Sequence, residues 1–118
     1  MTINILGIDY TIIVKKYTDD PYFEKNNADG YRDGATKEIG ICDLHTFPGF
    51  ENESDAHINA VQKSVLRHEI VHAFLYESGL DANSNASEGW ASNEEMVDWI
   101  AIQGPKIHAA WQEAGALP

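Results

Sequence analysis

The residues best suited to chemistry lie in one run, Arg67-His68-Glu69-Ile70-Val71-His72-Ala73, which contains the pattern His-Glu-x-x-His. Residues four positions apart lie on one face of an α-helix, so His68 and His72 can bind one metal ion together. Glu69 projects at about 100° from His68, which puts its carboxylate beside the metal rather than on it. Zinc lowers the pKa of a bound water toward about 7, and a neighbouring carboxylate can take its proton. The pattern therefore predicts one zinc ion per chain, with Glu69 as the general base.

A third ligand is expected in the run Asn93-Glu94-Glu95-Met96-Val97-Asp98, where a second helix is predicted to begin. Glu94 and Asp98 share one face of that helix, because they too are four residues apart. We predict that Glu94 binds the metal and that Asp98 accepts the free N–H of a ligand histidine, which fixes the tautomer of the imidazole. Three other ligands stay open: Glu95, whose position also fits a helix capping box, Asp98 itself, and His108.

These two segments together resemble the gluzincin metallopeptidases, the thermolysin-like clan. In that clan, Asn-Glu-x-x-Ser-Asp carries the glutamate ligand and the aspartate beside it, and here Val97 stands where the pattern has Ser. The short chain and the run Glu-Glu-Met-Val-Asp-Trp-Ile-Ala also resemble the compact ImmA/IrrE-like peptidases of phages, prophages and other mobile elements. The resemblance covers roughly residues 38–103. It implies a zinc-dependent metalloendopeptidase that hydrolyses a peptide bond of a peptide or protein substrate.

In a second interpretation, the metal site is present but the chain does not hydrolyse peptides. The chain would then be a catalytically inactive metal-binding or partner-binding regulatory module of a phage or mobile element. Four protein ligands would favour a closed structural site, whereas three ligands and a water would favour the enzyme. The residue that stabilises an oxyanion also stays open, since Tyr76, Trp90 and Tyr31 are candidates by residue type alone.

The composition restricts the classes of partner that the chain can bind and indicates its cell compartment. The chain has 118 residues and a formal net charge of −11, which argues against nucleic acids and anionic membranes as partners. Cys42 is the one cysteine, so no disulfide can form within the chain, and we expect its side chain to be buried. The first residues lack the basic and apolar regions of a signal peptide. We therefore expect a cytoplasmic protein.

The residue pattern before the metal motif predicts strands. Residues 2–17 are rich in β-branched and aromatic types around Gly7 and Asp9, which indicates a hairpin. Residues 18–36 are polar and rich in Asp, Asn and Gly, which indicates a long loop. Residues 38–44 are predicted to form a third strand. This is either an ordinary strand of the sheet or an edge strand that pairs with an extended substrate.

The rest of the chain is predicted to be helical. A central helix is expected over residues 56–78, ended by Gly79, and a loop over residues 81–91. A second helix over residues 92–103 should end at Gly104-Pro105, and a short last helix should follow. These elements predict a single α+β domain over residues 1–118. In it, a sheet of about three strands packs on the zinc helix beside two further helices.

Overall fold

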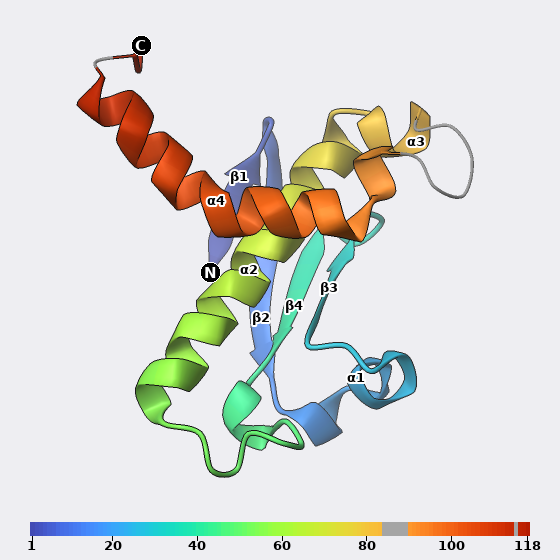
Figure 1. Cartoon of the computed structure of the whole chain (residues 1–118). Helices are drawn as coiled ribbons and strands as arrows, with labels where there is room; N and C mark the ends of the chain where they lie inside the picture. Colours follow the sequence, from blue (N-terminus) through green and yellow to red (C-terminus); the bar gives the residue numbers. More distant parts are fainter. Residues whose placement is uncertain (84–89, 115) are drawn as a thin grey trace.

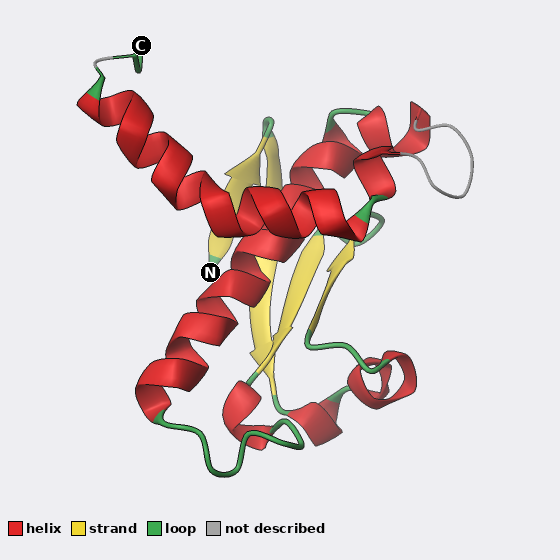
Figure 2. Cartoon of the chain, viewed as in Figure 1, coloured by secondary structure: helices red, strands yellow, loops and turns green. Residues whose placement is uncertain are grey.

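The computed structural model describes residues 1–83, 90–114 and 116–118. It confirms an α+β architecture, in which one sheet is covered by a long helix (Figure 1, Figure 2). The sheet has four strands rather than three, in the order β1-β2-β4-β3. The strands are β1 (Thr2–Ile5), β2 (Ile8–Lys15), β3 (Gly30–Asp33) and β4 (Glu38–Cys42).

The predicted N-terminal hairpin is confirmed. β1 and β2 pair antiparallel, and Leu6 and Gly7 form the turn with φ values of 51° and 88°. Asn4 closes this turn, because its side-chain oxygen accepts a hydrogen bond from the Gly7 N–H at 2.9 Å. The hairpin places Ile5 and Tyr10 in the core, where both side chains are buried.

The predicted loop over residues 18–36 is wrong, because this segment contains helical turns and a strand. A 3₁₀ turn, η1 (Tyr17–Asp19), leads into α1 (Pro21–Asn26), whose N-terminus is capped by Asp20. The carboxylate of Asp20 accepts from the Tyr22 N–H at 3.0 Å. β3 follows and pairs antiparallel with β4. Its four residues are mostly polar, so the strand forms through its partner rather than through an apolar pattern of its own.

The third predicted strand is confirmed as β4, but it is not an edge strand. It pairs in parallel with β2 on one side and antiparallel with β3 on the other. Its last four residues are all buried, as expected for a central strand, and they include Cys42. The edge of the sheet on this side is therefore β3. A second 3₁₀ turn, η2 (Leu44–Thr46), follows β4.

The central helix α2 (Asp55–Glu77) begins and ends within one residue of its predicted bounds, and it lies across the sheet (Figure 1). At its N-terminus, the Ser54 hydroxyl accepts a hydrogen bond from the His57 N–H at 3.1 Å. Beyond its C-terminus, Gly79 has a left-handed backbone conformation with φ of 82°. Val65 and Ala73 of α2 belong to the same buried cluster as residues from β1, β2 and β4. α3 (Leu80–Asn83) and a 3₁₀ turn, η3 (Trp90–Ser92), follow. Residues 84–89 of the predicted loop lie outside the described residues.

The last helix, α4 (Glu94–Glu113), differs from its prediction at both ends. Its first turn is capped by Asn93, whose side chain accepts from the Met96 N–H at 2.9 Å. The helix then continues through Pro105, so the predicted break and the separate last helix are wrong. Proline removes the N–H that the Ala101 carbonyl would accept, and the Arg67 Nε of α2 donates to that carbonyl instead at 2.8 Å. The α4 ribbon bends along its course and projects beyond the sheet (Figure 1).

No helix in the described ranges combines the length and the apolar character that a membrane crossing requires.

Candidate metal centre

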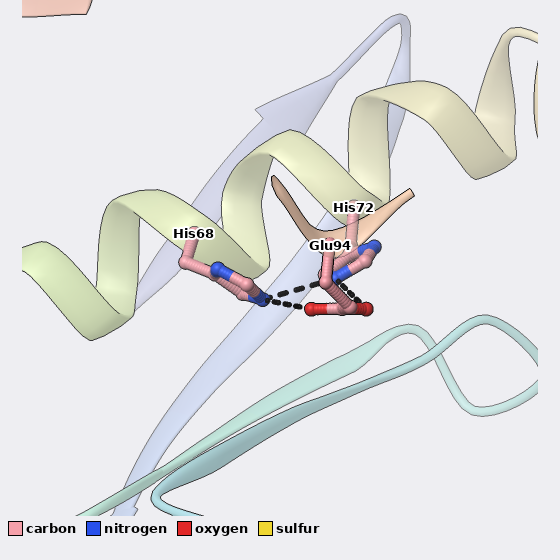
Figure 3. Close-up of side chains that lie close together, drawn as sticks. All are labelled: His68, His72 and Glu94. Carbon is pink, nitrogen blue, oxygen red and sulfur yellow. Dashed lines mark hydrogen bonds and ion pairs between the residues drawn. The ribbon is translucent and has the colours of Figure 1, made fainter. Parts of the chain in front are cut away.

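The two histidines of the motif and Glu94 converge at one point (Figure 3). α2 presents His68 and His72 from consecutive turns, with 3.0 Å between their Nε2 atoms. Glu94, the first residue of α4, lies 3.0 Å from His68 Nε2 through Oε2 and 3.1 Å from His72 Nε2 through Oε1. The donor atoms of the three side chains lie within 4.8 Å of one another. The structure thus brings together the three residues that the sequence predicts as ligands.

This donor set fits zinc. Two imidazole nitrogens and one carboxylate are common zinc ligands, with bonds of about 2.0–2.2 Å. Donor atoms around one tetrahedral ion at such bond lengths lie roughly 3.3 Å apart. The separations in the structure, 3.0 to 3.1 Å, require the three side chains to move apart by only a few tenths of an ångström. The residues that would hold the ion are His68, His72 and Glu94.

Asp98 lies behind the cluster, as predicted. Its Oδ1 is 2.5 Å from His68 Nδ1. A carboxylate there holds the proton on Nδ1 and leaves the lone pair of Nε2 facing Glu94. Because Asp98 is one turn after Glu94 on α4, one short stretch of this helix supplies both a ligand and the group that orients another ligand.

The other proposed ligands are placed elsewhere. Neither Glu95 nor His108 lines the cavity around the cluster, and both side chains are exposed. His108 lies beyond Pro105, on the projecting part of α4. Asp98 is engaged with His68 Nδ1, on the far side of the imidazole from the three donor atoms. Among the described residues, only the predicted three form a candidate metal site.

Glu69 has the environment of a general base. Glu69 is only 6 % exposed to solvent, yet it lines the same cavity as His68, His72 and Glu94. Burial raises the pKa of the Glu69 carboxyl to about 7, and the negative charges of Asp29 and Glu94 act in the same direction. A carboxyl with such a pKa exchanges protons readily near neutral pH. Burial also lowers the pKa of His72, which favours the neutral imidazole that a metal needs.

A glycine on the edge strand leaves space for Glu69. A Cβ atom placed on Gly30 would lie 2.9 Å from Val65 Cγ1 and 3.2 Å from both Cγ and Oε1 of Glu69. These separations are tighter than ordinary van der Waals contacts, so β3 can approach α2 this closely only because residue 30 has no side chain. Gly30 therefore sets the position of the carboxylate that faces the cavity.

The cavity has a volume of about 610 Å³ and lies between α2 and the segment from α1 to β3. That segment contributes Tyr22, Asp29, Gly30 and Arg32, none of which the sequence analysis identified. The sequence gives little indication of a strand here. Asp29-Gly30 and Asp33-Gly34 are typical of turns, and the residues between them are polar. Only the pairing of β3 with β4 brings these residues opposite the ligands.

The residue that stabilises an oxyanion is open in the sequence, and none of its three candidates by residue type is placed with the metal cluster. The Tyr31 hydroxyl donates to Glu38 at 2.6 Å and accepts from Lys15 at 2.8 Å, so it is engaged away from the metal ligands. The Tyr76 ring lies under the guanidinium of Arg32, and Trp90 does not line the cavity. The site thus consists of three candidate metal ligands, the aspartate that contacts His68 and a buried glutamate. Comparisons of the chain with protein families, with curated proteins and with solved structures find no match.

Proposed function

We propose that this chain is a zinc-dependent metalloendopeptidase of the gluzincin type. The observation that carries the proposal is the convergence of His68, His72 and Glu94 beside a buried glutamate that faces the same cavity. Three protein ligands leave a coordination position open, which is the arrangement of a catalytic rather than a structural zinc site.

The chain's own residues would share the work as follows. Asp98 holds the proton on His68 Nδ1 and so keeps Nε2 available as a ligand atom. Zinc, when bound, would polarise the scissile carbonyl and lower the pKa of the attacking water. The Glu69 carboxylate would accept a proton from that water and later donate it to the nitrogen of the leaving amine. Its raised pKa suits both steps, because the group must be deprotonated first and protonated afterwards.

The edge strand offers a place for the peptide. β3 pairs with β4 on one side, and no other strand of the described residues pairs with its second side, so the N–H and C=O groups there could pair with an extended chain. Residues of β3 and the metal ligands line the same cavity, so a peptide laid along β3 would pass the ligands. In this proposal β3 pairs with the substrate, in place of the strand predicted over residues 38–44.

The first test is metal content and cleavage in wild type, His72→Ala and Glu69→Gln. We expect one zinc per chain in the wild type and in Glu69→Gln, and none in His72→Ala. Cleavage of an unstructured protein such as denatured casein, followed by mass spectrometry, should occur only with the zinc-loaded wild type. A loss of the general base should lower the rate by roughly 100- to 10,000-fold.

The same variants separate the enzyme from the inactive module. A wild type that binds zinc but cleaves nothing, with Glu69→Gln indistinguishable from it, would favour a metal-binding or regulatory role. A wild type that takes up no zinc even when the ion is added would refute the metal site itself.

A further inference from the structure

Arg32 lies on the face of β3 that is turned toward α2. Successive side chains of a strand alternate, so Arg32 points to the same side as Gly30, which approaches Glu69. The guanidinium carbon lies 4.4 Å from the centre of the Tyr76 ring. Tyr76 follows His72 by one helical turn, and Arg32 lines the metal cavity. The guanidinium is therefore placed along the zinc helix, about one turn beyond a metal ligand.

Three elements of the fold hold this side chain in position. Tyr76 of α2 lies against the guanidinium, and Asp81 of α3 forms an ion pair with Nη2 at 3.6 Å. A Cβ atom on Gly34, in the turn after β3, would lie 2.8 Å from Arg32 Nη1 and 2.4 Å from the Tyr76 ring. The missing side chain at Gly34 thus leaves room for both groups. An arginine held in this way has lost much of its rotamer freedom before any ligand arrives.

The guanidinium has few partners for a group with five N–H donors. Its Nε is buried, and among the described residues it finds no hydrogen-bond acceptor. Its ion pair with Asp81, at 3.6 Å, is longer than a hydrogen bond. A buried donor without an acceptor destabilises a fold, so such groups are uncommon outside functional sites. The fork of the guanidinium matches a carboxylate, which can accept two hydrogen bonds from it.

The charges around the cavity make this position selective. Apart from the two histidines, the charged side chains that line the cavity with Arg32 are all acidic: Asp29, Glu69, Glu94 and Asp98. Of the cavity side chains that the structure describes, Arg32 alone is a permanent cation. A second cavity, of about 510 Å³, is also lined by Arg32, together with Tyr76 and Gly34, which lie next to its guanidinium. There is thus space beside it for a substrate group.

We infer that Arg32 binds a carboxylate of the substrate and so selects acidic peptides. The carboxylate is either the side chain of an Asp or Glu residue near the scissile bond or the terminal carboxylate of a short peptide. The inference rests on the proposed peptidase function, since it names the substrate class of that site. The acidic surroundings repel a carboxylate at other positions, so we expect the preference at one position of the peptide only.

The test uses octapeptides that differ only in one Glu or Gln, moved along the sequence, and in a C-terminal acid or amide. Cleavage by the zinc-loaded wild type is measured by mass spectrometry, and binding to zinc-loaded Glu69→Gln by competition in fluorescence polarisation. At one position, we expect Glu to be favoured over Gln by roughly 10- to 100-fold. Arg32→Gln should reduce that ratio to about one, and Arg32→Lys should retain part of it. Lys63→Gln removes the same charge from α2 outside the metal cavity and should leave the ratio unchanged.

The outcomes separate the inference from the proposed function. Equal cleavage and binding of acid and amide peptides by the wild type would overturn the role of Arg32 alone. An equal fall on both peptides in Arg32→Gln would also overturn it, and would indicate stabilisation of the oxyanion instead. If no peptide is cleaved but acid peptides still bind more tightly through Arg32, the peptidase function is refuted and the carboxylate site is supported.

A second variant covers the case in which Arg32→Gln does not fold. Asp81→Asn removes the carboxylate that competes for the guanidinium, yet its side-chain oxygen can still accept from the Ser92 hydroxyl, now at 2.8 Å. We expect this change to increase the preference for Glu over Gln severalfold. An unchanged preference in the folded, zinc-loaded variant would contradict the inference.

Discussion

The two walls of the metal cavity are built in different ways. The helix wall presents five titratable side chains beside Val61, Ser64 and Val65 of α2. The five are His68, Glu69 and His72 from α2 with Glu94 and Asp98 from α4. The strand wall consists of Tyr22 and residues 29–32, where a glycine provides space and an arginine provides charge. The helix wall suits proton and metal chemistry, whereas the strand wall suits the holding of a peptide. The comparison teaches that titratable groups at a fixed helical spacing can be recognised in the sequence, whereas the residues of a short polar strand are recognised only once its pairing is known.

The largest expected effect comes from filling the space that the strand wall leaves. Gly30→Ala places a methyl group within 3.2 Å of the Glu69 side chain, so the carboxylate must move. Because small displacements of a catalytic group are costly, we expect kcat to fall about 100-fold while one zinc per chain is retained. Gly104→Ala is the matched control, because an added Cβ there meets nothing within 4 Å. Equal activity of the two variants would show that the strand wall does not position the base.

A smaller effect is expected behind the helix wall. Asp98→Asn removes the charge that faces His68 Nδ1, so zinc affinity should fall by roughly 10- to 100-fold. Competition with a chromogenic chelator measures this change. Glu95→Gln, three residues earlier on the same helix, removes an exposed charge that does not line the cavity. If both variants weaken zinc binding equally, net charge rather than the contact with His68 accounts for the effect.

The helix wall also depends on the contact that joins its two helices. Arg67→Met leaves the Ala101 carbonyl without its donor, which should destabilise the fold by about 1–2 kcal/mol. Thermal or urea unfolding measures this change. Pro105→Ala restores a backbone N–H to that carbonyl, so adding it to Arg67→Met should recover part of the loss. Purely additive effects of the two changes would mean that Arg67 does not compensate for the proline.

The smallest effect concerns the support of the strand wall at acid pH. The Tyr22 N–H and then the Lys15 ammonium hold the pKa of Asp20 below its ordinary value of 3.8. Above pH 3.8, the ionised Asp20 carboxylate therefore stabilises the folded state. This stabilisation is lost as the pH falls through the lowered pKa of Asp20. In Asp20→Asn, which can still cap α1, we expect a loss of no more than about 1 kcal/mol at pH 7 and a shallower loss of stability in acid. Asp19→Asn, at an exposed neighbouring position, should behave as the wild type.

The sequence predicts most of the helix wall and little of the strand wall. The fixed spacing of His68 and His72 needs only one helix, and Glu94 and Asp98 repeat that spacing on another. Which acidic residue would approach the histidines was open in the sequence, and the crossing of α4 over α2 places Glu94 there. The zinc, the hydrolysis and the cytoplasmic location remain predictions.

Two errors show where local rules fail. β3 is short and polar, so its strand conformation depends on pairing with the neighbouring strand β4 rather than on an apolar pattern of its own. Pro105 is expected to end a helix because it leaves a carbonyl unpaired, yet Arg67 on another helix supplies a donor. In both places a contact outside the element itself, with the paired strand or with another helix, overrides the local preference.

The origin of the ligands on two helices has a consequence for folding. An ion held by His68, His72 and Glu94 would be a cross-link between α2 and α4, and it would close a loop of the chain that includes residues 84–89. An unfolded chain cannot hold the three donors together, so binding energy becomes folding energy. Zinc concentration would then set the population of the folded chain as well as its activity, and a cell that withdraws zinc would expose the protein to its proteases.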